Sequence, residues 1–342
     1  MLIALPMLGL GLLSIYTGVR FHIYATTIFV ISYFFLLYSI IEYLKIKKSF
    51  AIFLILLFTV PSLYENSKII QYWNTQGAKP VFYPEQVKAL RNLEKQVKSN
   101  DYAVTWWDFG GTLRYYTGLT TMINNATHHA DNYTVANILL SDSSKFTHHA
   151  THYFYDLFEK HKSNAIYRGL QAHNDSEILF DYIEHDYVPP KKNRDKYIIL
   201  PSQLAPLIYT MYVFANIDPL SGKKLTNHIF KRFRKTREDK QFVYLHDHSK
   251  IDKHTSKLST QNKIFAIKNI SLLRYKNNKK EVRHTKVSNK GLHLIVKDNE
   301  YYIMDDYFYN SIVVQMLFFN NYDKKYFSPI YEGKTISIYT VK

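Results

Sequence analysis

The first fifth of this 342-residue chain is almost wholly apolar, whereas the remainder is polar and basic. Residues 21–44 contain one late carboxylate, Glu42, in a run that is otherwise without Asp, Glu, Lys or Arg. A helix needs about 20 predominantly apolar residues to cross the hydrocarbon core of a bilayer. The sequence therefore predicts a transmembrane helix near residues 21–44.

A second span is predicted near residues 50–70. Residues 50–64 are apolar, and Tyr72 and Trp73 follow with amphipathic aromatic rings of the kind enriched at membrane interfaces. Residues 1–16 are apolar too, but they lack the basic start and the small-residue cleavage site of a signal peptide. We expect them to be the tail of a helix that begins earlier, so that residues 1–73 form a membrane region of two or three helices.

The loop between the two predicted spans indicates the orientation in the membrane. This loop carries Lys45, Lys47 and Lys48, and basic loop residues favour the cytoplasmic side. Residues from 65 onward are therefore expected outside the cytoplasm.

The net charge of +16, from 44 basic and 28 acidic residues, raises nucleic acid as a partner. The predicted location argues against it, and the basic residues do not form the aromatic-interleaved stripe of single-strand binders. Attraction to anionic lipid head groups is the alternative. The lack of cysteine excludes disulfides and thiolate metal ligands. We predict that the chain does not bind nucleic acid.

Beyond the membrane region, helical and strand patterns alternate up to about residue 227. Gly110-Gly111 is expected to turn the chain from a strand into a helix. In chain order we expect a helix over 84–98, a strand over 102–105, helices from 112, over 144–162 and over 178–187, and a strand over 197–200. This alternation indicates a mixed α/β core over residues 74–227.

Short β-like runs separated by charged turns predict a β-rich insert over residues 228–297. Residues 298–342 are expected to return to the core with a strand over 301–304, a helix over 307–319 and a strand over 336–339. The predicted fold class is α+β, with two or three N-terminal transmembrane helices followed by a mixed α/β extracytoplasmic domain with a β-rich insert.

Trp106, Trp107 and Asp108 stand side by side at the end of the predicted strand over 102–105. Side chains beyond the carboxyl end of a strand point into the crevice where α/β folds usually keep their sites. An indole offers only an N–H donor and an ionised carboxylate only accepts, so these three side chains match the needs of one hydroxyl group. The alternative is a pair of core aromatics with Asp108 capping the next helix.

In this order, Trp106-Trp-Asp-Phe-Gly110 resembles the W-W-D-x-G signature of the bacterial single-subunit oligosaccharyltransferases of the PglB type. Residues 5–11 and Gly18-Val-Arg-Phe21 look like the last membrane-proximal motifs of that family. Further matches, in order and spacing, are Met304-Asp305, Asn310-Ser311, Val314-Gln-Met316 and Asn321-Tyr-Asp-Lys324. The resemblance covers the C-terminal half of the family, and it implies a place in the bacterial inner membrane with the main domain on the periplasmic side.

The resemblance implies transfer of an oligosaccharide from an undecaprenyl-diphosphate carrier to the Asn of an N-x-S/T sequon in an acceptor protein. In that family the Trp-Trp-Asp site binds the Ser or Thr hydroxyl, a role that would fall to Trp106, Trp107 and Asp108. The family's M-x-x-I motif contacts the threonine methyl group. The resemblance implies Leu204-Ala-Pro-Leu207, followed by Ile208, as the corresponding stretch, although the motif is not kept. Core packing is the alternative for Leu204, Leu207 and Ile208.

Arg20 matches an arginine that faces the donor pyrophosphate in the family. A guanidinium suits that task because it stays charged and pairs bidentately with phosphate oxygens, while the alternative is an interfacial anchor at a helix end. The resemblance also places His128 and His129 near the lipid-linked donor, as weaker candidates. Gly111 departs from the family, which usually has an aromatic residue there.

The metal-binding carboxylates of the family, including its D-x-D motif, are expected in a half that this sequence does not contain. Manganese or magnesium is therefore expected in the complete enzyme, while this chain should bind no metal, hold no catalytic residue and be inactive alone. His148 and His152 are four residues apart on a predicted helix, a spacing that suits a metal. No Glu completes an H-E-x-x-H pattern, so we interpret them as surface residues.

Two hypotheses of different classes remain. The chain is either the acceptor-recognising part of an oligosaccharyltransferase, with a separate N-terminal half as partner, or a non-catalytic membrane-anchored module that binds peptide or glycan. An adjacent upstream reading frame with many spans and a D-x-D motif would favour the first.

Overall fold

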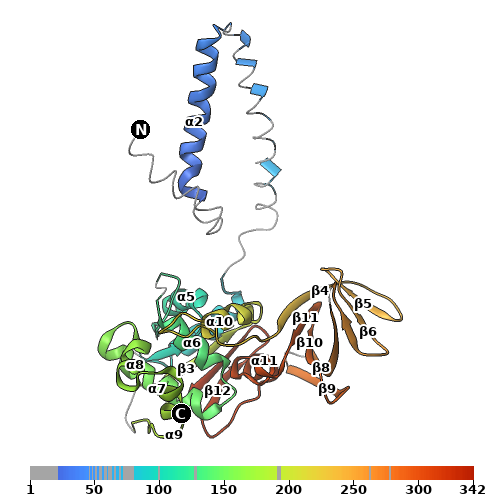
Figure 1. Ribbon diagram of the computed structural model, residues 1–342. Coiled ribbons are helices and arrows are strands. Elements are labelled where there is room, and N and C mark those ends of the chain that lie inside the picture. The colour runs from blue at the N-terminus through green and yellow to red at the C-terminus, as the bar shows by residue number, and fades with distance from the viewer. Residues whose placement is uncertain are drawn as a thin grey trace. The chain divides into compact units, whose positions relative to one another are not determined.

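The computed structural model describes residues 22–45, 81–98, 101–126, 129–190, 194–261, 263–276 and 279–342, together with scattered positions between 47 and 71. The chain divides into two compact units, Met1–Pro80 and Val81–Lys342 (Figure 1).

In the first unit, helix α2 spans His22–Tyr43. From Val30 onward its apolar side chains are largely exposed, with 63% of Ile31 and 70% of Phe35 accessible. Within the described part of the chain, no helix combines the length and the apolar character needed to cross a membrane. Residues 1–16, Arg20 and most of the predicted span over 50–70 lie outside the described residues.

The second unit contains a smaller sheet with the strand order β12-β13-β3-β1-β2. Strand β1 lies parallel to both β2 and β3, while β13 is antiparallel to β3 and to β12. The strands are β1 (Tyr102–Val104), β2 (Thr120–Thr121), β3 (Lys196–Pro201), β12 (Phe327–Glu332) and β13 (Ile336–Val341). Strands β1 and β3 are buried along their whole length, so this sheet lies at the centre of the main hydrophobic core.

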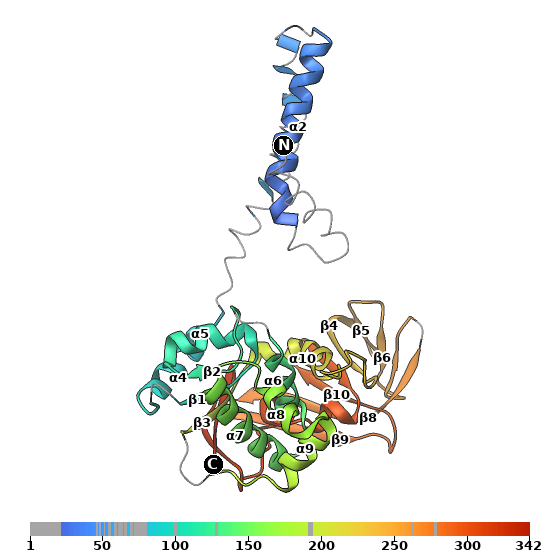
Figure 2. The same ribbon diagram turned by 60° about the vertical axis from the view of Figure 1, so that its left-hand side comes forward.

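Helices surround the smaller sheet because each of them has apolar side chains to bury. They are α4 (Pro84–Glu94), α5 (Trp107–Thr117), α6 (Asp131–Leu140), α7 (Ser144–His161), α8 (Ala165–His173), α9 (Ser176–His185), η3 (Ser202–Leu207), α10 (Ile208–Ala215), α11 (Asp306–Asn310), α12 (Ile312–Val314) and η4 (Gln315–Phe319). Both views place α5, α7 and β3 on one side of the unit and β4, β5 and β6 on the other (Figures 1 and 2). The mixed α/β core is therefore confirmed in outline.

The larger sheet has the order β10-β11-β4-β5-β6-β7-β8-β9, and β8 also pairs in parallel with β10. This extra pairing closes the strands from β10 to β8 into a ring, which leaves fewer unpaired edges. The strands are β4 (Phe230–Glu238), β5 (Phe242–Leu245), β6 (Lys250–Asp252), β7 (Lys257–Ser259), β8 (Ile264–Lys276), β9 (Lys279–Lys286), β10 (Leu292–Lys297) and β11 (Glu300–Met304). A second hydrophobic cluster, which includes Phe233, Leu258 and Ile303, belongs to this sheet.

Two details at the C-terminal end differ from the sequence-based expectation. Strand β11 pairs with β4 and β10, so it belongs to the larger sheet, and the chain returns to the core after Met304. The helix expected over 307–319 is broken into α11, α12 and η4. The break occurs because Ser311 is extended and its hydroxyl donates to the carbonyl oxygen of Phe308 at 2.7 Å.

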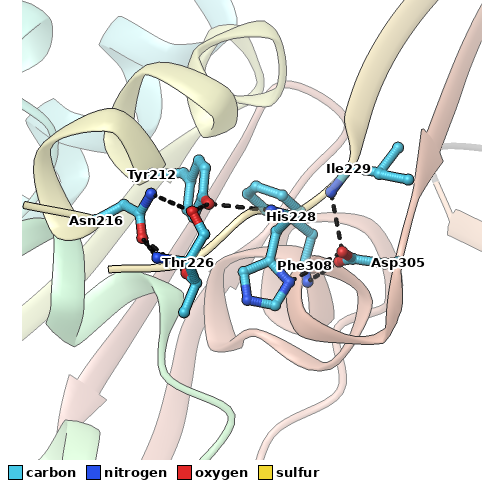
Figure 3. Close-up of polar contacts among 7 residues, drawn as sticks. All are labelled: Tyr212, Asn216, Thr226, His228, Ile229, Asp305 and Phe308. Atoms are coloured by element: carbon cyan, nitrogen blue, oxygen red, sulfur yellow. Dashed lines mark hydrogen bonds and ion pairs between the residues drawn. The ribbon is translucent and has the colours of Figure 1, made fainter. Parts of the chain in front are cut away.

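A polar network joins the two segments that connect the core with the larger sheet (Figure 3). On the outgoing segment, the side chain of Asn216 donates to the carbonyl oxygen of Thr226 at 2.7 Å and accepts from its backbone amide at 2.7 Å. The carboxylate of Asp305, on the returning segment, lies 3.0 Å from His228 Nδ1 and accepts from the amide of Ile229 at 2.9 Å. These bonds fix where the larger sheet leaves the core.

Candidate functional site

The Trp-Trp-Asp motif lies where β1 ends and α5 begins. Trp106 follows the buried strand in an extended conformation, and the helix starts at Trp107. The expectation that Gly110-Gly111 forms a turn and that the helix starts at 112 is therefore wrong. Both glycines lie inside the helix, which places Trp107 and Asp108 in its first turn. A Cβ on Gly110 would lie closer than 3.0 Å to the carbonyl oxygen of Ile123, so the glycines let the segment after β2 pass directly against α5.

Strand β1 is held in place by a tyrosine of α7. The hydroxyl of Tyr155 donates to the carbonyl oxygen of Ala103 at 2.5 Å and accepts from the amide of Met122 at 3.3 Å. Burial raises the pKa of this hydroxyl well above its usual value. Tyr155 therefore remains a neutral donor that joins the site-bearing strand to the segment beside α5.

Phe214 of α10 covers the two tryptophans. Its ring meets Trp106 and Trp107 edge-on, at centroid distances of 5.6 Å and 5.7 Å. The two indoles are 5.7 Å apart, with Trp106 completely buried and Trp107 half-buried. The sequence analysis did not find Phe214, although a signal was present, because Met211-Tyr-Val-Phe214 keeps the methionine and the spacing of M-x-x-I with an aromatic last residue.

Two consecutive polar groups at the end of β1 are buried without a hydrogen-bond partner among the described residues. They are the hydroxyl of Thr105 and the indole Nε1 of Trp106. A buried donor without a partner costs about 1–3 kcal/mol, which makes it a candidate for pairing with a ligand. Thr105 is a second residue that the sequence analysis missed.

Asp108 is exposed, and no side chain caps α5. The alternative in which Asp108 caps α5 is therefore wrong. The exposed carboxylate lies two residues after the buried Trp106, in the first turn of α5. Trp106 nevertheless fits the other half of that alternative, since it is a core aromatic.

Comparison with known proteins shows which proteins this chain is similar to. Residues 99–221 match the STT3/PglB/AglB core domain. Two curated proteins from Campylobacter jejuni strains, each an undecaprenyl-diphosphooligosaccharide–protein glycotransferase, are 24% identical over the whole of this chain. The chain is thus similar to the C-terminal half of PglB-type proteins. It spans about half of the length of these curated relatives, 50% in each case.

The fold agrees with a solved member of the PglB-type family. The crystal structure of the C. jejuni PglB C-terminal domain is similar with a TM-score of 0.65, at 20% sequence identity. The match covers 75% of this chain and 99% of that domain. The second unit therefore has the fold of a PglB C-terminal domain.

The apolar residues proposed for the threonine methyl group differ in exposure. Leu204 and Ile208 are completely buried in the main core, whereas Leu207 is half-buried. Complete burial fits the packing alternative for Leu204 and Ile208. The aromatic side chain that packs against both tryptophans is instead Phe214, which was not among the residues predicted to contact the threonine methyl group.

Of the candidates for the donor pyrophosphate, only His129 lies among the described residues; Arg20 and His128 lie outside them. His129 Nδ1 accepts from the amide of Asp131 at 3.2 Å and lies 3.3 Å from the Asp131 carboxylate. Burial raises the pKa of that carboxyl group. His129 is thus engaged with the start of α6.

His148 and His152 both contact the carbonyl oxygen of Lys342, at 2.5 Å and 3.2 Å. Their interpretation as surface residues is wrong for His152, which is only 7% exposed. Burial lowers the pKa of His152 to about 3. Across the described ranges no group of three or more His, Asp and Glu side chains is placed to hold a metal ion, so we assign no step to a metal here.

Proposed function

We propose that this chain is the acceptor-recognising part of an oligosaccharyltransferase, in which Trp106, Trp107 and Asp108 bind the Ser or Thr hydroxyl of an N-x-S/T sequon. The main support is the buried indole N–H of Trp106, which lacks a partner among the described residues, near the exposed carboxylate of Asp108. The indole would donate to the hydroxyl oxygen and the carboxylate would accept its proton. The names of the curated relatives support the reaction class.

Binding in this manner requires the packing around Trp106 to open, because its Nε1 atom is buried, and we propose that Phe214, which packs against both indoles, is the ring that moves. Each edge-on aromatic contact contributes about 0.5–1.5 kcal/mol beyond its buried area. A hydrogen bond to the buried N–H of Trp106 recovers about 1–3 kcal/mol, so the loss of the two aromatic contacts and the gain of this hydrogen bond are nearly equal in free energy. Phe214 then offers an apolar surface to the threonine methyl group.

We propose that the remaining parts of the reaction involve partners. Arg20, His128 and His129 are assigned to the pyrophosphate of the undecaprenyl-diphosphate donor, and a separate N-terminal half is expected to supply the catalytic carboxylates and a bound Mn or Mg ion. The complete enzyme would use that cation to stabilise the departing pyrophosphate. The chain by itself would be inactive.

Membrane attachment on the periplasmic side is part of the proposal. It is supported by the exposed apolar side chains of α2 and by the uncharged run over 21–41. In the second unit, the outer face of α10 and the loop after it also expose apolar side chains beside Lys223 and Lys224. Apolar side chains with adjacent lysines suit the surface of an anionic membrane. The exposed residues are Tyr209, Val213, Ile217, Leu220 and Leu225.

A peptide titration tests the hydroxyl site. The full chain in neutral detergent, with Trp73 replaced by Phe so that only Trp106 and Trp107 fluoresce, is titrated with an Asn-Ala-Thr peptide and its Asn-Ala-Val counterpart. We expect the Thr peptide to bind about fivefold more tightly, since one hydrogen bond contributes about 1 kcal/mol net. Asp108→Ala should remove this preference.

Asp186→Ala, at another exposed aspartate, is the matched control and should keep the preference. Equal binding of the two peptides by a folded chain would reject the hydroxyl site. Peptide preference without glycopeptide formation, even when the N-terminal half of a relative is added, would favour a non-catalytic binding module.

A further inference from the structure

A cavity of about 430 Å³ lies in the second unit, where the larger sheet approaches the core. The larger sheet contributes Arg232 and Arg234 from β4 and Lys297 from the end of β10. The turn between β12 and β13 contributes Lys334. Asp298 and Glu300 are the acidic residues that line it. Four basic side chains therefore face two carboxylates, which leaves a surplus of two positive charges.

The carboxylates do not neutralise the lysines. Glu300 forms an ion pair with Arg232 and also accepts from the hydroxyl of Tyr302. Neither Lys297 nor Lys334 forms an ion pair with a carboxylate in the part of the chain that the structure describes. The Nε atom of Arg232 is buried and also lacks a partner among those residues. Among the described residues, the cavity thus contains two lysines without an ion-pair partner and the Nε atom of Arg232 without a hydrogen-bond partner.

Both walls of the cavity are held in place by hydrogen bonds. On the core side, the buried side chain of Gln86 donates to the carbonyl oxygen of Thr335 at 2.5 Å and to Gln203 at 2.7 Å. On the larger sheet, Lys297 pairs with Glu300 in register across a hairpin, and Asp298 adopts a left-handed conformation in its turn. The backbone of both walls is therefore fixed before any ligand arrives, which reduces the entropic cost of binding.

Burial lowers the pKa of Lys297, the charges of Asp298 and Glu300 raise it, and the charge of Lys334 lowers it. An anion beside Lys297 would offset the cost of burying its ammonium group and the repulsion from Lys334.

We infer that this cavity binds a phosphate-bearing anion, with Lys297 and Lys334 as its main ionic contacts and Arg232 Nε as a further donor. A phosphate monoester carries about −1.5 to −2 charges near neutral pH, which matches the surplus of two positive charges. A single carboxylate carries half of that charge. The phosphate could come from a free metabolite or from a lipid head group, and both have the same chemistry at the site.

Calorimetric titration of the full chain in neutral detergent at low salt tests this inference, with inorganic phosphate and glycerol 3-phosphate as probes. Glycerol 3-phosphate represents a lipid head group. We expect Lys297→Gln and Lys334→Gln each to weaken binding about tenfold, which corresponds to 1.4 kcal/mol. Lys297→Arg should keep binding. Lys240→Gln, at an exposed lysine outside the cavity, controls for non-specific attraction to a basic protein.

The outcomes distinguish the two possible sources of the phosphate. Binding of both probes supports a phosphate monoester that includes lipid head groups, whereas binding of inorganic phosphate alone supports a free anion. The absence of saturable binding, an equal loss with Lys240→Gln, or equally tight binding of acetate would overturn the inference. The cavity shares no residue with the Trp-Trp-Asp site, so its failure would leave the proposed function intact.

Discussion

Gly110 and Gly111 are neighbours in α5, yet a methyl group added to each would meet a different kind of atom. On Gly110 it would crowd the carbonyl oxygen of Ile123 and lie 3.0 Å from the Cα of Asn124, both of which belong to the backbone. On Gly111 it would meet only the side chain of Asn125, which is exposed and can rotate away. Alanine substitutions at the two positions therefore separate close backbone packing from helix propensity.

We expect Gly110→Ala to destabilise the chain and Gly111→Ala to be neutral or stabilising. Replacing a helical glycine by alanine contributes about 0.8–1 kcal/mol through propensity at either position. At Gly110, overpacking costs about 1–3 kcal/mol, and more if the backbone after β2 must shift. The net loss at Gly110 is then up to roughly 2 kcal/mol, and more if the backbone must shift, while Gly111→Ala gains up to about 1 kcal/mol.

Urea unfolding of the full chain, followed by the fluorescence of Trp106 and Trp107 in a Trp73→Phe background, measures both effects. Gly110→Ala should lower the midpoint and should also weaken the preference for the Thr peptide, because Trp107 and Asp108 share its helical turn. Gly111→Ala should leave both unchanged or raise the midpoint. Equal destabilisation by the two substitutions would refute the reasoning, since it would show that the close approach at Gly110 is not what requires glycine.

Three further predictions concern residues around the site and the core. Tyr155→Phe should cost about 1–3 kcal/mol in urea unfolding, because Ala103 and Met122 lose a buried partner, whereas Tyr153→Phe should cost less. Burial lowers the pKa of His152 in the folded protein to about 3 from the usual 6.5. The contribution of its neutral form to folding stability is therefore complete above pH 6.5 and is lost as the pH falls toward 3. Stability should fall by at most about 2 kcal/mol between pH 6.5 and pH 5 on its account, and an unchanged pH slope in His152→Gln would contradict this. Phe214→Ala should reduce the preference for Thr over Ser peptides in the same fluorescence titration, while Phe214→Leu keeps it; equal preferences in both would remove Phe214 from the site.

The elements that local patterns could predict were those with strong periodicity, such as α4 and the helix α7. The start of α5 was misplaced because Gly-Gly usually marks a turn, and only the passage of residues 123–125 against the helix explains why glycines lie inside it. Strand β11 was assigned to the core because its partners β4 and β10 are set by long-range pairing. The short β-like runs separated the insert from the core, but no local signal placed β11 with the larger sheet.

The candidate site was predictable from the sequence only in part, because one of its side chains is also placed by long-range packing. Trp106, Trp107 and Asp108 are adjacent in sequence, and their donor and acceptor groups can be counted directly. Phe214 lies more than 100 residues later, and its place against the indoles depends on how α10 packs. The M-x-x-I comparison was applied to η3 and the first residue of α10, where the side chains of Leu204 and Ile208 are buried in the core.

The two interpretations of the tryptophans, core packing and ligand binding, are compatible because they concern different atoms of the same residue. The carbon framework of Trp106 is packed on all sides, which fixes the direction of its N–H bond. A donor held in this way loses little entropy when it binds, and the surrounding apolar groups strengthen the hydrogen bond by excluding water. In the proposed site, Asp108 would supply the complementary acceptor from the exposed first turn of α5. Rigidity on the indole side and access on the carboxylate side would let such a site reject a peptide that lacks the hydroxyl, because that peptide would open the packing around Trp106 and still leave the buried donor unpaired.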